Sequence, residues 1–295
     1  TTMYVGYDTP KGAENISLAI NEETGDVSLS WDAVTEGVNG GYVGDVKYDV
    51  VRYPDKTVVA KGITETSFSD KIASKDFMAY AYGVKAYNDK KTGEEVRSDY
   101  KVYGDAMNLP YSEEFDCEDA MAYFTIIDNN NDDSKWFYNY TDGNGEARYK
   151  YNKNNVGDDW LITPPLKVEK NKVYTVKFKA KSYRSSLVEK LEVKYGSSNT
   201  VEGMTTELLP AMELPGAYTE FTKEITATED GKLYIGFHAV SEPDQYYLQL
   251  DDISVSAGMT ASAPTAADDF TVVPAEKGAL SATISFTAPT KAING

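Results

Sequence analysis

Hydrophobic residues recur at every second position in several segments, and no segment has the spacing of an amphipathic helix. Four such runs lie at residues 27–31, 78–86, 174–180 and 233–239. In each run the apolar side chains share one face of an extended chain, which is the pattern of a half-buried β-strand. Because turns rich in Gly, Asn, Asp and Pro separate the strands, the pattern predicts an all-β fold of tandem antiparallel β-sandwiches.

The length of the chain, 295 residues, is that of two or three domains. The linker at residues 103–110 is short. We expect four stretches: residues 1–9 as the last strand of a preceding unit or an N-terminal extension, residues 10–106 as a first sandwich, residues 107–258 as a second sandwich, and residues 259–295 as a linker with the first strands of a truncated domain.

The first sandwich carries Trp31 on an early strand and a late Tyr-x-Val-x-Ala-x-Asn run from Tyr82 to Asn88. In these residues it resembles a fibronectin type III domain, over about a third of the chain. Trp31 would fill the centre of the sandwich, and Tyr82 would bury its ring and satisfy its hydroxyl at a corner.

The end of the chain repeats the beginning of this sandwich in part. Residues 264–286 parallel residues 10–31, with Phe286 in the place of Trp31. The stretch 259–295 therefore resembles the start of a truncated fibronectin type III domain, whose two strands cannot close a sandwich alone. We expect a tandem array, in which the neighbouring domains of one parent chain are partners.

The second sandwich has an acidic loop with Asp128, Asn130 and Asp132 at alternate positions. Carboxylate and amide oxygens with this spacing are the ligands that a hard cation such as calcium takes in a tight loop. The loop is not an EF-hand, because Asp133 and Asn139 stand where that motif needs Gly and Glu. The alternative is that these side chains cap a turn through Asx hydrogen bonds.

Two aspartates interrupt the last strand of this sandwich. Leu248 and Leu250 share one face of the strand. Ile253 and Val255 continue on the opposite parity. Both pairs can face one core only if a β-bulge lies at Asp251–Asp252.

A bulge at this place would aim the carboxylate of Asp252 toward the edge of the domain. Glu114, on the opening strand, would join it there. We interpret Glu114 and Asp252 as further candidate metal ligands. The alternative is edge charge, which discourages the aggregation of sheets.

Four ordered motifs carry a second resemblance. They are Glu114-Phe115, the acidic loop with Trp136 four residues after Asp132, Trp160-Leu161-Ile162-Thr163-Pro164, and Leu250-Asp251-Asp252-Ile253. They resemble the cleaved-adhesin domains of gingipain-type bacterial surface proteases, related to MAM-like jelly rolls, over about half of the chain. The resemblance implies a jelly-roll β-sandwich with bound calcium, used in surface adhesion. Asn131 and Asp133 stand where that family commonly has glycine, and both residue types enter the left-handed region more easily than other non-glycine residues.

Aromatic residues near the acidic loop are candidates for ligand binding. Trp136, Tyr138 and Tyr140 share one strand parity and would form an aromatic strip, and Tyr246 lies in an acidic turn. Exposed aromatic rings stack on sugars or anchor a protein partner. The alternative is core packing, which we also expect for Trp160 in its buried strand.

The charge balance excludes some classes of partner. Acidic residues number 47 against 29 basic ones, a net charge of −18, whereas nucleic-acid binding needs a basic footprint. The sequence contains no run of 18 apolar residues, so it predicts no membrane span. Cys117 is the single cysteine, which excludes an intramolecular disulfide. The first residues lack the features of a signal peptide, so we interpret the chain as a piece of a longer exported bacterial protein, secreted or on the cell surface.

Catalytic signals are weak. His238 is the only histidine, so a two-histidine zinc site is excluded, and no nucleophile is evident beside it. Cys117 lies between Asp116 and Glu118, which disfavour a reactive thiolate. We therefore do not expect an enzyme.

These observations predict a non-catalytic extracellular adhesion or recognition module of a bacterial surface or secreted protein, with a calcium-stabilised jelly roll. Its partner would be a host or matrix protein or a glycan. One alternative is a carbohydrate-binding module of a secreted glycan-degrading or proteolytic enzyme, and another is a structural spacer.

Overall fold

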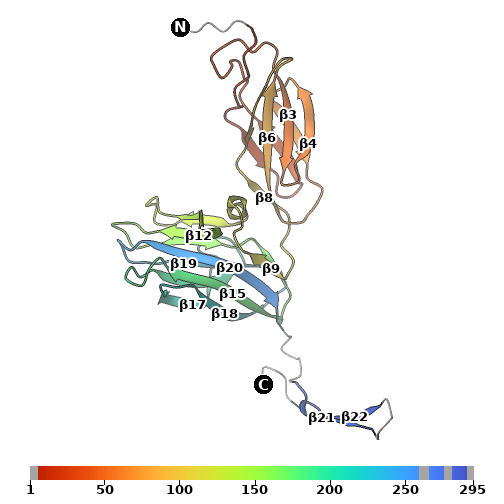
Figure 1. The fold of residues 1–295 in the computed structure, drawn as a ribbon, viewed down its shortest axis with the longest axis vertical. Helices are drawn as coiled ribbons and strands as arrows, with labels where there is room; N and C mark the ends of the chain where they lie inside the picture. Colours follow the sequence, from red (N-terminus) through yellow and green to blue (C-terminus); the bar gives the residue numbers. More distant parts are fainter. Residues whose placement is uncertain (1–5, 259–265, 276–280, 291–295) are drawn as a thin grey trace. The chain divides into compact units, whose positions relative to one another are not determined.

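The computed structural model describes residues 6–258, 266–275 and 281–290. Its contacts divide the chain into unit 1, Thr1–Met107 with Cys117–Thr125, and unit 2, Asn108–Asp116 with Ile126–Gly295. Both units are built of antiparallel strands, as Figure 1 shows, so the predicted all-β class is confirmed. Among the described residues, no helix is long and apolar enough to cross a membrane.

The division of the chain differs from the expected one at segment 117–125, and the contacts group the two expected end stretches with unit 1 and unit 2. Residues 117–125 contain the short 3-10 helix η1 (Glu118–Tyr123) and belong to unit 1, because η1 packs against β6 and β8 of that unit. The sequence placed this segment in the second sandwich. Residues 1–5 of the expected preceding strand and residues 259–265 of the expected linker lie outside the described residues.

Unit 1 contains two sheets that share a core. The first sheet has the strand order β1 (Ser17–Ile20), β2 (Asp26–Ser30), β5 (Ser67–Lys71). The second sheet has the strand order β4 (Thr57–Ile63), β3 (Lys47–Tyr53), β6 (Met78–Tyr87), β7 (Thr92–Arg97), and β8 (Lys101–Tyr103) also pairs with β6. Figure 1 shows β3, β4 and β6 alongside one another. Val27 and Leu29 from the first sheet pack against Val50 and Val84 from the second.

Trp31 and Tyr82 take the places in unit 1 that the sequence predicted for them. Trp31 is buried, and its ring lies edge-on to Tyr48 with 5.3 Å between the ring centres. Tyr82 is fully buried, and its hydroxyl donates to the Asp70 carboxylate at 2.8 Å. Because a buried hydroxyl without a partner costs free energy, this hydrogen bond allows the whole tyrosine to lie in the core.

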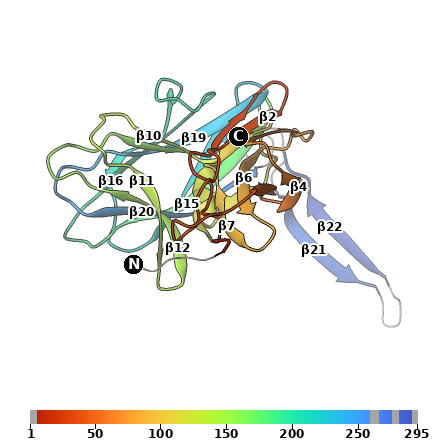
Figure 2. The same ribbon diagram turned by 90° about the horizontal axis from the view of Figure 1, so that it is seen from above.

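Unit 2 is a larger sandwich of two sheets. The first sheet has the strand order β10 (Thr125–Asp128), β13 (Asp159–Ile162), β19 (Gly231–Ala239), β16 (Lys190–Gly196), β17 (Thr206–Glu213), and β14 (Leu166–Val168) also pairs with β19. The second sheet has the strand order β11 (Trp136–Thr141), β12 (Asn144–Lys150), β20 (Tyr247–Ala257), β15 (Val173–Ser182), β18 (Thr219–Thr226), and β9 (Tyr111–Glu113) also pairs with β20. Figure 2 shows β10 and β19 in one layer and β12, β15 and β20 in the other. Phe178 of one sheet meets Phe237 of the other edge-on at 5.1 Å, so the sheets share one core and the predicted jelly-roll sandwich is confirmed.

The β-bulge predicted in the last strand of this sandwich is present. Lys177 of β15 pairs with Ser254 and Lys179 pairs with Asp251, so the single residue between them faces two residues of β20. Asp252 lies in the left-handed region with φ +50°. The bulge reverses the strand parity, and Leu248, Leu250, Ile253 and Val255 are all fully buried.

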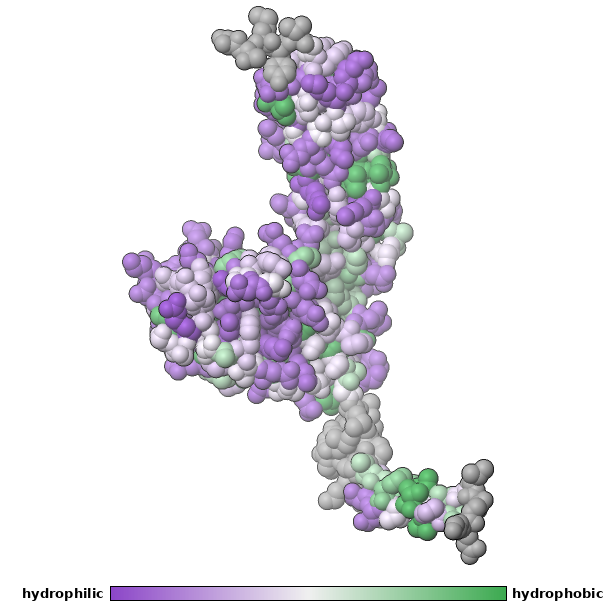
Figure 3. All heavy atoms as spheres, viewed as in Figure 1, coloured by the Kyte–Doolittle hydropathy of each residue, from purple (hydrophilic) through white to green (hydrophobic). Residues whose placement is uncertain are grey.

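Strands β21 (Asp268–Pro274) and β22 (Ala282–Thr287) form an antiparallel hairpin with Val272 opposite Ile284. The side chains of Phe270, Val272, Ile284 and Phe286 are more than half exposed, and Figure 3 shows hydrophobic surface gathered on this hairpin. These are two strands in the stretch where the sequence predicted the start of a truncated domain.

The bulge predicts an unequal effect of two substitutions at Asp252. A β-branched residue resists the left-handed region, so Asp252→Val should lower the free energy of unfolding of unit 2 by about 1–3 kcal/mol. Asp252→Asn keeps that conformation and removes only the half-exposed ion pair with Lys179, which should cost less than about 1 kcal/mol. Denaturant unfolding in a chelator, followed by peptide-resolved hydrogen exchange, measures the stability of unit 2 in both variants. Equal losses of stability would contradict the assignment of Asp252 as the left-handed residue of the bulge.

Candidate ligand-binding groove and acidic loop

The sheet that contains β11, β12 and β20 presents aromatic and charged side chains on its outer face. Tyr149 of β12 is fully buried in the core, so its neighbours Arg148 and Lys150 face outward. Phe137 of β11 lies opposite Arg148, and Tyr247 of β20 lies opposite Lys150. The register therefore places Phe137 and Tyr247 on the same outer face.

Five aromatic side chains meet on this face, and we call them the aromatic cluster: Phe137, Tyr151, Tyr183, Tyr246 and Tyr247. The ring of Tyr246 lies 4.3 Å from that of Tyr247 and 4.7 Å from that of Tyr183, measured between ring centres. Tyr151 lies 6.3 Å from Tyr246, and Phe137 lies 6.4 Å from Tyr247. All five side chains are partly exposed, so the cluster offers ring surface to a ligand.

Buried polar groups hold the backbone of the cluster. The N–H of Tyr246 donates to Glu189 Oε1 at 2.7 Å, and the N–H of Tyr151 donates to the carbonyl of Tyr246 at 3.1 Å. Glu189 is fully buried, and this burial raises the pKa of its carboxyl. The turn that carries Tyr246 is thus fixed to the interior of the sandwich.

A second buried carboxylate fixes the ring of Tyr247. Glu146 accepts hydrogen bonds from Arg148 Nε at 2.8 Å, from Gln249 Nε2 at 2.6 Å and from the Tyr218 hydroxyl at 2.5 Å. A buried charge requires such partners, and they hold the side chain of Arg148 in one orientation. The guanidinium of Arg148 lies over the ring of Tyr247 at 4.8 Å, so the network also orients that ring.

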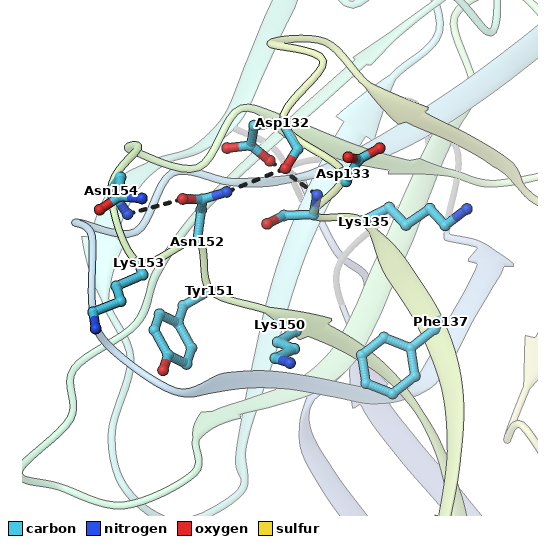
Figure 4. A pocket seen from close by; sticks show the side chains of 10 residues that line it. Asp132, Asp133, Lys135, Phe137, Lys150, Tyr151, Asn152, Lys153 and Asn154 are labelled. Carbon is cyan, nitrogen blue, oxygen red and sulfur yellow. Dashed lines mark hydrogen bonds between the residues drawn. The ribbon is translucent and has the colours of Figure 1, made fainter.

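A groove of about 570 Å³ adjoins the cluster. It is lined by Asp132, Asp133, Ser134, Lys135, Phe137, Lys150, Tyr151, Asn152, Lys153 and Asn154. Figure 4 shows Tyr151, Lys150 and Phe137 on one side of the groove and Asp132 and Asp133 on the other. Asn152 ties the lining together, because its amide donates to the Asp132 carbonyl at 3.2 Å and accepts the N–H of Asn154 at 2.8 Å.

The acidic loop closes on itself through side-chain hydrogen bonds. The carboxylate of Asp128 accepts the N–H groups of Asp132 at 3.1 Å and Asp133 at 2.9 Å. The amide of Asn130 donates to Asp132 Oδ2 at 3.0 Å. Asn131 and Asp133 lie in the left-handed region with φ +53° and +66°, as their residue types predicted. The structure brings all three candidate ligands together, and it also contains the Asx hydrogen bonds of the alternative interpretation.

Asp159 lies buried behind this loop, and the sequence did not single it out. Burial raises the pKa of its carboxyl to about 7, and the charges of Asp128 and Asp132 add to the increase. Its Oδ1 makes no hydrogen bond of normal geometry within the described part of the chain, although the nearby Tyr149 hydroxyl offsets part of the pKa increase. Among the described residues, no three or more His, Cys, Asp or Glu side chains are grouped as metal ligands.

The other two candidate metal ligands lie near the middle of β20 and just after β9. Glu113 pairs with Ile253 in an antiparallel register, so Glu114 and Asp252 are the next two residues that face one another. Glu114 is exposed, and Asp252 makes an ion pair with Lys179 at 2.5 Å. The structure therefore brings this pair near one another but not to the acidic loop.

The predicted aromatic strip requires a correction. Trp136 is buried, with 1% of its surface exposed, and its indole N–H donates to the Asp159 carbonyl at 3.1 Å. It cannot present its ring to a ligand, so its place in an exposed strip was wrong. Tyr138 is half-buried, and Tyr140 is exposed, but neither lines the groove. The physical reason is strand parity: Trp136 enters the core, and its neighbour Phe137 faces the groove.

Sequence reasoning missed four members of the aromatic cluster and found only Tyr246. The run of Lys177, Lys179 and Lys181 on the outward face of β15 continues directly to Tyr183, which could have marked that tyrosine as outward-facing. Tyr151 follows the outward Lys150 at the end of β12 and carries no periodic signal, because the strand ends there.

His238 and Trp160 lie on the outer face of the opposite sheet. Their rings are stacked with 3.9 Å between the centres, and Trp160 is buried as predicted. The ring nitrogens of His238 contact Glu192 at 2.9 Å and Asp158 at 2.8 Å. These partners occupy both nitrogens, so the imidazole has a structural role in this arrangement. Cys117 is exposed and free.

Comparison with known proteins gives matches among solved structures. No family model matches the chain, and no curated protein matches it. The K1 cleaved adhesin domain of Lys-gingipain from Porphyromonas gingivalis W83 is 18% identical, with 51% of this chain and 99% of that chain covered and a TM-score of 0.42. The K2 cleaved adhesin domain of Lys-gingipain is 19% identical, with 51% and 100% covered and a TM-score of 0.41. The CBM22-1 xylan-binding domain of Paenibacillus barcinonensis Xyn10C is 13% identical, with 50% and 92% covered and a TM-score of 0.36.

Asp159 predicts a pH dependence of stability. Its pKa of about 7 in the folded protein exceeds the usual 3.8, so the folded state binds more protons between about pH 4 and pH 7. The stability of unit 2 should therefore fall as the pH rises through this window, by at most about 4 kcal/mol, and level off above it. Asp159→Asn should remove this part of the fall, whereas Asp133→Asn, at an exposed position, should not. Denaturant unfolding in a chelator at several pH values measures this, and parallel curves for wild type and Asp159→Asn would contradict it.

Proposed function

We propose that unit 2 is a non-catalytic extracellular recognition module that binds a glycan at the aromatic cluster and the adjoining groove. The observation that carries this proposal is the position of five partly exposed aromatic rings beside a groove of about 570 Å³. Aromatic faces stack on the apolar faces of sugar rings, and a few polar groups then fix the orientation of the ligand. Asn152 and Lys150 supply such groups here.

The size of the groove favours a sugar chain over a protein surface. Its volume of about 570 Å³ lies within the range of about 300–1,000 Å³ for small-ligand sites. A stable protein–protein interface buries about 1,200–2,000 Å², which this groove alone does not supply. Adhesion to a host or matrix protein would then act through a glycan on that protein. A carbohydrate-binding module of a secreted enzyme would use the same surface, whereas a structural spacer would not use it.

Unit 1 would serve as a neighbouring fibronectin type III-like domain in a secreted or surface-bound bacterial chain. The strand order β1-β2-β5 facing β4-β3-β6-β7, the buried Trp31 and the hydrogen-bonded Tyr82 support this assignment. A rigid sandwich of this kind would present the recognition module without binding the ligand itself.

Calcium would stabilise the acidic loop of unit 2. The support for this part of the proposal is the nearness of Asp128 and Asp132, whose charges help to raise the pKa of the buried Asp159, together with the lack of a hydrogen bond of normal geometry at Asp159 Oδ1. The side chains would have to draw closer around the ion, because they do not form a group of three ligands in the described residues. Asn130 would add an amide oxygen, because its nitrogen already donates to Asp132 and to Val156. These oxygen donors are of the type that calcium takes, and a bound cation would offset their mutual repulsion. Glu114 and Asp252 would form a separate, weaker site, since Lys179 already neutralises Asp252.

Alanine substitutions in the aromatic cluster test the ligand site. Tyr151→Ala and Tyr246→Ala should each weaken glycan binding by about 3–10-fold, because each removes one stacking surface. Tyr140→Ala is the control, since Tyr140 is exposed but lies outside the groove. A glycan array followed by calorimetry on the full chain gives the affinities. Equal binding by all four proteins would show that the ligand site lies elsewhere.

Calcium addition and removal test the acidic loop. Calcium at about 100 times its dissociation constant should add about 2.7 kcal/mol to the stability of unit 2, and a chelator should reverse the gain. The double variant Asp128→Asn/Asp132→Asn should lose the response to calcium, and Asp252→Asn should keep most of it. Thermal unfolding of each protein with and without calcium gives the comparison. A melting temperature that calcium leaves unchanged in the wild type would disprove the calcium proposal.

A further inference from the structure

The groove carries positive charge in a strongly acidic protein. The chain has a net charge of −18, yet three lysines line this one groove: Lys135, Lys150 and Lys153. All three are exposed, and none makes an ion pair with a carboxylate of the described residues. The lining therefore holds three ammonium groups without an ion-pair partner, against the two carboxylates of Asp132 and Asp133.

Some of the lysines elsewhere on unit 2 make ion pairs with carboxylates, and others do not. Lys179 pairs with Asp252 at 2.5 Å, and Lys190 pairs with Glu242 at 2.9 Å. Lys177 of β15 pairs with Glu220 at 3.3 Å. Lysines without an ion pair also occur outside the groove. The groove differs from the rest of unit 2 because it gathers three of them in one lining.

The lysines lie beside the ring surfaces that a sugar would cover. Lys150 is opposite Tyr247 in the sheet and lies on the same side of the groove as Phe137 and Tyr151 (Figure 4). A sugar ring stacked on these aromatics would bring a carboxylate or sulfate at its edge within reach of the Lys150 ammonium. Charge-assisted hydrogen bonds of this kind are stronger than those between neutral groups.

The two acidic residues of the lining also affect where an anionic ligand would bind. Asp132 accepts the N–H of Ser134 at 2.9 Å and the amide of Asn130 at 3.0 Å, so its carboxylate is engaged within the loop. Asp132 and Asp133 lie on the other side of the groove from Lys150 (Figure 4). Lys135 lies beside these two aspartates (Figure 4), so an anionic ligand would be repelled by the aspartates and drawn toward Lys150 and the aromatic cluster.

We propose that the groove selects an anionic glycan, whose uronate or sulfate groups bind Lys135, Lys150 and Lys153 while its sugar rings stack on the aromatic cluster. This inference rests on the proposed glycan-binding function and adds the charge of the ligand. The three lysines determine specificity, and the aromatic rings supply contact area that neutral and charged sugars share.

A matched pair of probes separates charge from sugar shape. Oligogalacturonate and its fully methyl-esterified form have the same rings, and only the first is anionic. The full chain should bind oligogalacturonate at least about tenfold more tightly, and the preference should shrink when salt rises from about 0.1 M to about 1 M, since the Debye length falls from about 10 Å to about 3 Å. Chondroitin sulfate and its desulfated form repeat the test for sulfate.

Two triple variants supply the matched comparison within the protein. Lys135→Gln/Lys150→Gln/Lys153→Gln should lose at least about tenfold in affinity for the anionic probe that binds and little for its neutral partner. The control has the same change of net charge at lysines of β14, β18 and β19 that do not line this groove: Lys167→Gln/Lys223→Gln/Lys232→Gln. It should bind as the wild type does, and circular dichroism of both variants should match the wild type.

The possible results distinguish the two proposals. If neutral and anionic sugars bind equally and the groove variant binds as the wild type does, the charge inference is wrong while glycan recognition stands. If neither these probes nor a wider array of glycans binds, the proposed function fails, and the inference fails with it. If polyglutamate binds through the groove lysines as tightly as the anionic sugars do, the groove recognises acidic chains in general, which overturns selection of a glycan.

Discussion

The pairing of β20 with its neighbours is the constraint on which unit 2 depends. This strand pairs with β15 along one side. Along its other side it pairs with β12 in its first half and with β9 in its second half. Its first half buries Leu248 and Leu250, and its second half buries Ile253 and Val255. Both halves reach one core only because the bulge at Asp252 changes the parity of the strand. Without the bulge, one half would expose its apolar side chains.

The same constraint positions the outer face. With Leu248 turned into the core, Tyr247 and Gln249 must face outward, where Tyr247 joins the aromatic cluster and Gln249 binds Glu146. The carboxylate of Glu146 lies almost fully buried beneath Tyr218 and Arg148, and it is stable there because four side chains donate hydrogen bonds to it. A polar network thus supports the aromatic cluster, and a binding site needs side chains that are held in place in this way.

The sequence predicted the fold well because the alternation of apolar residues is a local signal. The strands at 26–30, 78–87, 173–182 and 231–239 match the predicted runs, and the broken parity of β20 predicted its bulge. The left-handed conformations of Asn131 and Asp133 also followed from their residue types. Segment 117–125 could not be assigned in this way, because its place depends on packing rather than on pattern.

The candidate site was predicted only in part, because it is assembled from distant segments. Phe137 and Tyr247 are 110 positions apart in the sequence, and only the register of β11, β12 and β20 brings them together. Along β11, aromatic residues occur at both parities, so the pattern alone did not reveal that Trp136 enters the core and Phe137 faces the groove. The three groove lysines gave no signal at all, since an unpaired lysine is recognised only when the positions of the carboxylates are known.

Peptide-resolved amide hydrogen exchange of the full chain, with and without a bound glycan, tests the central claim most directly. The account predicts that protection increases in residues 134–137, 150–154 and 241–247, which carry the groove and most of the aromatic cluster. The outer face of the opposite sheet, around Trp160 and His238, and the whole of unit 1 should remain unchanged. Protection confined to either of those regions, with no change at the groove, would contradict the account.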